Sequence, residues 1–307
     1  MLTMVCTTVN GELTLENCLD FRFEKERYTP YTYFEGTWLS PISDLSEIVR
    51  VEVYHDTVLI HRGTPDGVEM AMDKGRNILS VRSRGYSNAL LKNRPATGIQ
   101  TNVTLASIGS SAVICPFVDY EQNTPTVGLI NYYENTSIWD AIVCYTQQAT
   151  GTYPYIREVN TVMSSKPQNP MTYIAACDSL LSRSYGSDYS KTVSAVTMSD
   201  TQGNSGVYSL VEPALTERNI IRLQSLPFDH EWMMNPQAGI YSRIAYSMRG
   251  YRYESFKLLG WIGVDLLDKL RLDDGSVDRE ISKLTVIGGR DKPVITELTC
   301  YHDAFCD

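Results

Sequence analysis

The densest group of catalytic residue types in the sequence is the run Asp229-His230-Glu231. A carboxylate beside an imidazole is a usual pair for general acid–base catalysis, which requires both groups to reach one substrate atom. Neighbouring side chains on an extended chain point in different directions, so they rarely converge on one atom. The run therefore indicates a solvated polar loop more strongly than an active site.

A second group, near the end of the chain, has the residue types of a metal site: Cys300, His302, Asp303 and Cys306. Structural zinc needs four ligands held in place, and a frayed chain end with free thiols is the favoured interpretation. The acidic run 273–278 lacks the later ligands of a calcium loop, so it predicts a turn between strands. We expect no bound metal.

Motifs for nucleotide binding and acyl transfer are absent. The chain has no G-x-x-x-x-G-K-[ST] phosphate loop, no G-x-G-x-x-G turn and no G-x-S-x-G elbow. A glycosidase needs two carboxylates at a fixed separation, but among 36 acidic residues some pair can always be found. We therefore expect no cofactor and no enzymatic activity.

Charge and composition restrict the partners. The chain has 307 residues, with 36 acidic against 27 basic side chains, a formal net charge of −9 and a pI of about 5.0. An acidic excess opposes sequence-independent binding to nucleic acid or to anionic membranes. No stretch approaches the roughly 20 apolar residues of a membrane helix. The seven cysteines are odd in number and scattered, which indicates reduced thiols in a protein made in a cytosol.

Residues 1–97 have the pattern of a first β-barrel-like domain. Val49, Val51 and Val53 alternate with polar residues, as in a strand with one buried and one wet face. Further short strands separated by turns are predicted over 58–62, 68–72 and 78–84.

Residues 98–170 predict a small α+β domain around the clearest helix of the chain. Ser137 followed by Asp140 has the spacing of a capping box, and Gly151 lies just beyond the helix end. The helix has one apolar face, made by Ile138, Ile142, Tyr145 and Ala149. The region also has a predicted short helix, a strand and a hairpin, over 104–110, 125–132 and 153–163.

Residues 171–307 predict a second β-barrel-like domain that includes one helix near 238–249. Ile240, Ile244 and Met248 are spaced by four, and Gly250 ends the helix. Strands are predicted over 191–198, 207–211, 251–259 and 267–272, with a closing hairpin over 283–301. The predicted fold class is thus α+β and mostly β, with two small antiparallel β-barrel-like domains and a small α+β domain between them.

The run Trp232-Met233-Met234 is the clearest candidate for partner contact, and it lies in a loop over 222–237. Aromatic and methionine side chains are enriched at the cores of protein interfaces. The alternative is that the loop folds back and buries these side chains in its own core. The sequence favours neither interpretation.

Several passages carry a family resemblance. Residues 134–142 and 151–155, with the hairpin that follows them to Met163, resemble the central unit of the tail hub (baseplate hub) proteins of contractile-tailed phages and phage-like particles. Residues 185–198 are similar to the strand that opens the second barrel of those hubs. Residues 263–301 resemble its closing strands, and residues 49–85 resemble the first barrel. The likeness is one of pattern and order over most of the chain, and residues 1–40 and 223–237 lie outside it.

The resemblance implies a structural hub subunit that forms a homotrimer. Two similar barrels from each of three chains would make a ring of six units, which joins a sixfold tail tube to a threefold central spike. The tail tube protein, the spike protein, the tape measure protein and the baseplate wedge are the partners that it implies, with no membrane partner and no specific nucleic-acid binding. The location implied is the baseplate of a virion, an R-type bacteriocin or a related injection particle, assembled in the host cytoplasm.

Two other functions stay open. A virion-associated hydrolase that acts on the cell wall would need a cleft lined by carboxylates. A β-barrel module could bind oligosaccharide or single-stranded nucleic acid by stacking on tyrosine faces, and the chain has 20 Tyr against 7 Phe. These tyrosines are spread over the whole chain, however, which makes the binding module the weaker alternative.

Overall fold

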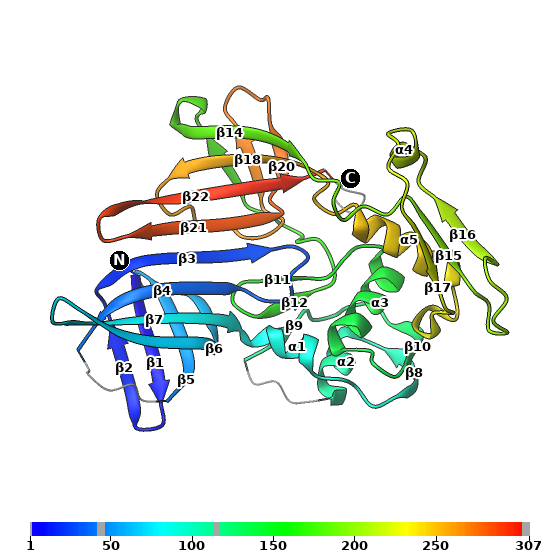
Figure 1. Cartoon of the computed structure of the whole chain (residues 1–307), viewed down its shortest axis with the longest axis horizontal. Helices are drawn as coiled ribbons and strands as arrows, with labels where there is room; N and C mark the ends of the chain where they lie inside the picture. The colour runs from blue at the N-terminus through cyan, green and yellow to red at the C-terminus, as the bar shows by residue number, and fades with distance from the viewer. Residues whose placement is uncertain (1, 42–46, 113–116, 303–307) are drawn as a thin grey trace.

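The dominant feature of the fold is one sheet of eleven strands (Figure 1). The computed structural model describes residues 2–41, 47–112 and 117–302. It is 48% strand and 17% helix, which confirms the predicted class, α+β and mostly β. In order across the sheet, the strands are β14 (Leu180–Ser187), β18 (Arg252–Leu259), β22 (Lys292–Tyr301), β21 (Lys283–Gly289), β3 (Cys18–Glu26), β4 (Tyr33–Ser40), β7 (Arg76–Gly85), β6 (Val58–Asp73), β5 (Ile48–His55), β1 (Leu2–Thr8) and β2 (Gly11–Leu15).

Antiparallel pairing of β3 with β21 joins the two ends of the chain within this sheet. The register runs from Lys283 opposite Glu26 to Gly289 opposite Asp20. At Gly289 the backbones approach closely, because a Cβ atom there would lie 2.3 Å from the carbonyl oxygen of Leu19. Glycine is therefore required where the pairing ends.

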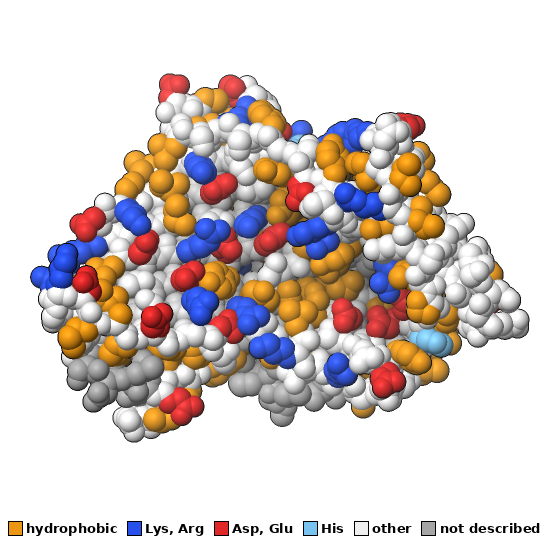
Figure 2. Space-filling model, viewed as in Figure 1, with side chains coloured by type: hydrophobic (Ala, Val, Ile, Leu, Met, Phe, Trp, Pro, Cys, Tyr) orange, Lys and Arg blue, Asp and Glu red, His pale blue; other side chains and the backbone are white. Residues whose placement is uncertain are grey.

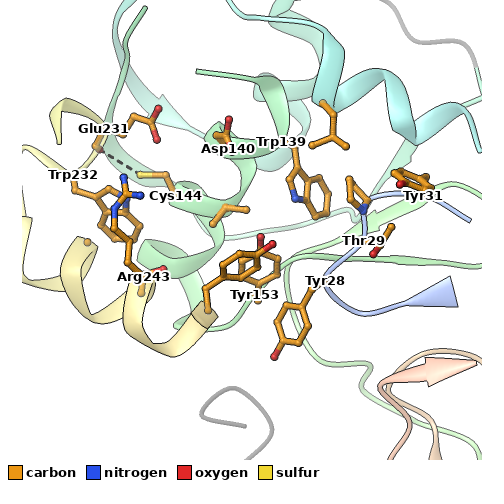
Figure 3. Close-up of a pocket in the computed structure, with 16 residues that line it drawn as sticks. Tyr28, Thr29, Tyr31, Trp139, Asp140, Cys144, Tyr153, Glu231, Trp232 and Arg243 are labelled. Carbon is orange, nitrogen blue, oxygen red and sulfur yellow. Dashed lines mark hydrogen bonds between the residues drawn. The ribbon is translucent and has the colours of Figure 1, made fainter. Parts of the chain in front are cut away.

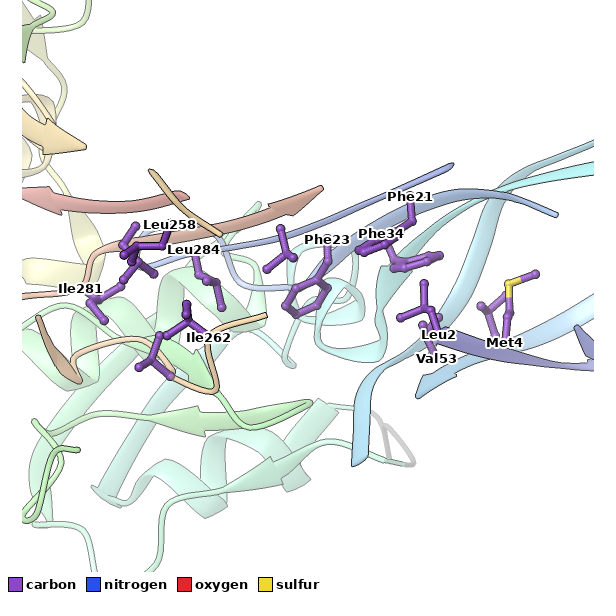
Figure 4. Packing of buried hydrophobic residues seen from close by; sticks show 14 of the residues in the cluster. Leu2, Met4, Phe21, Phe23, Phe34, Val53, Leu258, Ile262, Ile281 and Leu284 are labelled. Atoms are coloured by element: carbon purple, nitrogen blue, oxygen red, sulfur yellow. The ribbon is translucent and has the colours of Figure 1, made fainter. Parts of the chain in front are cut away.

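One apolar core extends beneath strands from both β regions (Figure 4). Phe23 of β3 lies in the middle of a row of buried side chains, with Leu284 and Leu258 on one side and Val53 and Met4 on the other. Burying side chains of this size contributes about 1.5–3 kcal/mol each. The two β regions therefore stabilise each other through shared burial as well as through backbone hydrogen bonds.

Trp261, in the segment after β18, adds an aromatic contact across the same junction. Its ring stacks on Phe23 with a centroid distance of 5.8 Å and on His55, at the end of β5, with 4.4 Å. Aromatic pairs of this kind contribute roughly 0.5–1.5 kcal/mol beyond the area that they bury. A residue of the C-terminal region thus packs directly against the N-terminal strands.

The middle of the chain is built around α3 (Ile138–Thr150), and the helix prediction is confirmed. Ser137 and Asp140 form the capping box: the Asp140 amide donates to Ser137 Oγ at 3.0 Å, and the Ser137 amide donates to Asp140 Oδ2 at 3.1 Å. Gly151 takes the left-handed conformation at the helix end, with φ of 69°. The surrounding elements are η1 (Tyr86–Asn88), α1 (Ala89–Lys92), β8 (Gly98–Val103), α2 (Leu105–Ala112), β9 (Asp119–Tyr120), β10 (Val127–Tyr132), β11 (Tyr155–Arg157) and β12 (Thr161–Met163).

Two small sheets complete the last third of the chain. One contains β13 (Thr172–Ala175), β19 (Lys269–Leu272) and β20 (Asp278–Glu280), with η2 (Cys177–Ser179) nearby in sequence. The other contains β16 (Tyr208–Val211), β15 (Ala195–Met198) and β17 (Leu223–Leu226), together with α4 (Pro213–Thr216), η3 (His230–Trp232) and α5 (Pro236–Ser247). Ile240 and Ile244 of α5 pack against Val196 and Met198 of β15 in a separate core. None of the helices in the described ranges is both long and apolar enough to span a membrane.

The predicted elements of this last third need correction at several places. The strand predicted over 191–198 begins only at Ala195, as β15. The passage 185–198, which resembles one strand of the hub proteins, is divided between two sheets, because Tyr185 belongs to β14. Asp188 separates β14 from β15, because its Oδ1 accepts from the Ser190 amide at 2.8 Å and closes a turn. The predicted loop 222–237 also contains a strand, β17. The predicted helix near 238–249 is confirmed with a shift, because Asn235 caps it and Pro236 begins it.

The first β region buries a neutral histidine. His61 of β6 is fully buried, with Nδ1 2.8 Å from Thr32 Oγ1 and Nε2 2.8 Å from Ser83 Oγ. Burial lowers the pKa of His61 to about 3. The folded chain therefore keeps this imidazole neutral at a pH where the unfolded chain protonates it.

We predict that acid destabilises the fold through His61. The pKa of His61 is lower in the folded chain than in the unfolded chain. The free energy of unfolding is therefore not reduced by His61 above about pH 6.5, and it falls as the pH drops toward 3. Between pH 7 and pH 5 this amounts to about 2 kcal/mol of unfolding free energy. Urea unfolding of the wild type and of His61→Gln at both pH values measures it, and the variant should show a correspondingly smaller pH dependence. His302→Gln, which removes an imidazole outside the core, is the control; equal pH dependence in wild type and His61→Gln would contradict the prediction.

Candidate functional site

The two ends of the large sheet are open strands. β14 has β18 as its neighbour in this sheet and β2 has β1, and among the described residues neither has a second partner there. On β14, Leu181 and Tyr185 are 52% and 65% exposed. An unpaired edge presents a row of backbone donors and acceptors that can pair with a strand of another chain. Both edges are therefore candidate interaction sites.

The solvent-facing side of the central strands carries paired charges of both signs. Figure 2 shows basic and acidic side chains interspersed where β22, β21, β3, β4 and β7 lie in this view. Exposed pairs of this kind contribute little stability one by one, since water and salt screen them. The pairs between neighbouring strands are Lys283 with Glu24 and Glu26, Lys257 with Glu297, and Lys292 with Asp20, and Arg22 pairs with Glu24 along β3 itself.

A buried ionic contact joins three parts of the chain. Lys25 of β3 is only 4% exposed, and its Nζ lies 2.5 Å from Asp265 Oδ1 and 2.6 Å from the carbonyl oxygen of Glu158. Beside it, Arg157 Nη2 lies 2.7 Å from Asp268 Oδ1. The first strand region, the hairpin of the middle region and the segment before β19 are thereby held together.

The sequence contains a signal for this contact in the alternation of β3, outside any motif. Lys25 is in phase with Phe21 and Phe23 on the buried face of β3. A lysine at an apolar position of an alternating strand needs a buried carboxylate partner, because an unpaired charge is too costly there. Which carboxylate serves cannot be read from the sequence, since Asp265 is remote along the chain.

The structure divides the candidate run Trp232-Met233-Met234. Trp232 is 7% exposed and belongs to the core around α3, whereas Met233 and Met234 are 38% and 68% exposed. Because Trp232 is buried, it holds the two exposed methionines in place at the surface, and we call this pair of methionines the surface step. Partner contact through this step stays a prediction.

The run Asp229-His230-Glu231 does not converge on one point. The Asp229 carboxylate caps η3 and pairs with Arg243. The His230 ring stacks on Tyr133 with a centroid distance of 4.5 Å. Glu231 accepts from the Thr136 hydroxyl. Each of the three side chains has a different structural partner, and His230 and Glu231 lie in η3 and are only partly exposed, so the expected solvated loop is wrong here.

A hollow of about 420 Å³ lies between α3, α5 and the segment that follows β3 (Figure 3). Its walls include the rings of Trp139, Tyr153 and Tyr28, and its charged groups are Asp140, Glu231 and Arg243. Burial raises the pKa of the Glu231 carboxyl above its ordinary value. Burial also raises the pKa of the Cys144 thiol to about 12, so this thiol is protonated at neutral pH and a poor nucleophile.

The expected metal candidates do not form a site in the described chain. Cys300 is buried in the shared core, and His302 Nε2 lies 3.5 Å from Glu254 Oε1. Asp303 and Cys306 lie outside the described residues. The run 273–278 is a turn between β19 and β20, in which Asp274 Oδ1 accepts from the Ser276 amide at 2.8 Å. Cys177, Asp273 and Asp274 come within 4.8 Å of one another at the surface, with nothing further there that indicates a metal.

Solved structures identify the fold. A tail protein from Neisseria meningitidis matches with a TM-score of 0.68 and 15% identity over 99% of this chain and 98% of its own. A 43 kDa tail protein of prophage MuSo2 from Shewanella oneidensis matches with a TM-score of 0.67 and 13% identity over 98% of each chain. A type VI secretion system component from E. coli, described as similar to the T4 tail proteins gp27 and gp5, matches with 0.52 and 10% identity over 95% of this chain and 77% of its own.

The chain therefore has the fold of phage tail proteins, and the resemblance drawn from the sequence is confirmed at the level of fold. No protein-family model matches the chain, and no curated protein matches it in sequence. The identities of 10–15% show that this fold is kept by very different sequences.

We predict that Lys25→Met destabilises the protein by about 3 kcal/mol, because it leaves the Asp265 carboxylate and the Glu158 carbonyl without their cation. The matched control is Lys292→Met, whose pair with Asp20 is exposed and should cost less than about 1 kcal/mol. Urea unfolding at pH 7 measures both. Equal losses in the two variants would show that the buried contact has no special role.

Proposed function

We propose that this protein is a structural hub subunit of a phage tail or phage-tail-like particle. In this proposal three copies form a ring that joins the sixfold tail tube to the threefold central spike. The observation that carries the proposal is the large sheet, which runs through both β regions and is open at β14 and at β2.

The two open edges support closure of a ring. They lie at opposite ends of one continuous sheet, so one chain can pair with a neighbour at each end. A head-to-tail contact repeated by rotation closes into a ring and leaves no edge exposed. The proposed domain limits, 1–97, 98–170 and 171–307, would give each chain two β units for such a ring.

The structural neighbours support the setting. Two of them are tail proteins with nearly the same extent as this chain, and the type VI component links the fold to tail proteins gp27 and gp5 of phage T4. By this likeness the proposed partners are a tail tube protein and a central spike protein, and the tape measure protein and the baseplate wedge are further proposed partners. The baseplate is the proposed location. The exposed step at Met233 and Met234 is a proposed contact with one of these proteins.

In this proposal the protein works through shape and assembly, without catalysis. The side chains that could form an acid–base set at 229–231 have separate structural partners. Zymography on peptidoglycan tests the hydrolase alternative, and a clearing zone made by the pure protein would favour the enzyme.

We predict that the isolated chain assembles into a species with three times the 34.6 kDa mass of one chain. Light scattering coupled to size-exclusion chromatography measures the mass, and electron microscopy should show a ring with a central hole. The double variant Leu181→Lys/Tyr185→Lys should remain monomeric, because lysines along an edge strand oppose pairing.

The matched control is Val58→Lys/Met72→Lys, which adds the same two charges at exposed apolar residues of the inner strand β6 and should leave the mass unchanged. A wild-type chain that is monomeric at every concentration, or a β14 variant that still forms the threefold species, would contradict closure through β14.

A further inference from the structure

We propose that the hollow between α3 and α5 is a binding site for an arginine side chain of a partner protein. The site is distinct from the two sheet edges. Its volume of about 420 Å³ is within the range of pockets that bind small groups, and it has both aromatic walls and carboxylates.

The charges in the hollow are unbalanced. Arg243, the cation that lines it, pairs with Asp229. Asp140 is held by the Ser137 capping box and Glu231 by the Thr136 hydroxyl, which leaves both carboxylates without an ion pair among the described residues. Figure 3 shows the two carboxylates on the same side of the hollow, above the rings in this view. An incoming cation would find two acceptors there.

Glu231 is the residue that benefits most from a cation. It is partly buried, and burial raises the pKa of its carboxyl; Asp229 and Asp140 act in the same direction, whereas the Thr136 hydroxyl and the Arg243 cation act against it. A buried carboxylate that has one hydroxyl donor is stabilised further by a charged donor. The lining of the hollow therefore favours a positively charged group.

The aromatic walls favour a guanidinium over an ammonium group. The rings of Tyr153 and Tyr246 stack with a centroid distance of 5.1 Å, and Tyr28 meets Tyr153 edge-on at 5.0 Å. The guanidinium carbon of Arg249 already lies 3.7 Å from the centroid of the Tyr246 ring, so this cluster of rings binds a guanidinium of the chain itself. A planar, weakly hydrated guanidinium stacks on such rings and donates hydrogen bonds to two carboxylates at once, which a compact ammonium does less well.

The test uses the full chain labelled with 5-fluorotryptophan and the peptide acetyl-Gly-Arg-Gly-amide. Trp139 and Trp232 line the hollow, whereas Trp38 and Trp261 lie in the other core and serve as internal controls. The peptide should move the ¹⁹F signals of Trp139 and Trp232 in a saturable way. The same peptide with citrulline, which has the shape of arginine without the charge, should bind at least about tenfold more weakly.

Glu231→Gln keeps an acceptor for Thr136 and should weaken arginine binding about tenfold. Glu231→Lys places a cation in the hollow and should abolish binding. The matched control is Glu121→Gln, which changes a half-buried glutamate that also accepts from hydroxyls, those of Ser164 and Ser165, but lies outside the hollow. Binding in this control should be unchanged.

Equal affinity for the arginine and citrulline peptides, or unchanged affinity in Glu231→Gln, would overturn the proposal. Signals of Trp139 and Trp232 that ignore the peptide but shift with protein concentration would also overturn it, because the occupant would then be a second copy of this chain. Failure of the arginine site would leave the ring-closure measurement untouched, since that measurement depends on β14 and not on the hollow.

Discussion

The pairing of β3 with β21 is the interaction on which the rest of the architecture depends. Without it each strand would be the edge of its own sheet, and the apolar core beneath them would be divided. Seven residue pairs, from Lys283 opposite Glu26 to Gly289 opposite Asp20, fix the register. A slip by one residue would turn Phe21 and Phe23 toward solvent, so the shared core holds the register as firmly as the backbone bonds do. The constraint is mutual: the sheet needs the core, and the core needs both chain ends.

Charged contacts divide into two kinds around this junction. Beneath the sheet, the buried Lys25 meets Asp265, and the partly exposed Arg157 meets the buried Asp268, and these contacts tie the middle region to the strands. On the solvent side, pairs such as Lys283 with Glu24 balance charge across the strands and contribute little stability. Removing a buried partner is costly because the other charge is left without water. The contacts of Lys25 and Arg157 therefore fix how the regions are arranged. The pairs on the solvent side leave the exposed face with both positive and negative charges.

Local patterns allowed much of this fold to be predicted, because their cause lies within a few residues. The capping box at Ser137 and Asp140 and the closing hairpin of β21 and β22 are of this type. β14 was missed because most of its side chains are exposed and polar, so it has no alternating pattern. The β3–β21 pairing and the hollow at Glu231 depend on segments that are remote in sequence, and no local spacing specifies which segments meet. The sequence indicates that Lys25 needs a carboxylate partner, but only the structure identifies that partner as Asp265.

These observations explain how one fold tolerates identities of 10–15% among its relatives. Backbone pairing and apolar burial determine the large sheet, and many sequences with the same alternation satisfy both. Pairing at a sheet edge is made by backbone groups. Assembly through such edges therefore places few constraints on which side chains the strands carry. Side-chain chemistry matters where a partner must be distinguished from others, as in a hollow with two carboxylates that lack a cation. In the proposed hub, the edges would then set the geometry of assembly, and features such as the hollow at Glu231 would select which protein attaches to it.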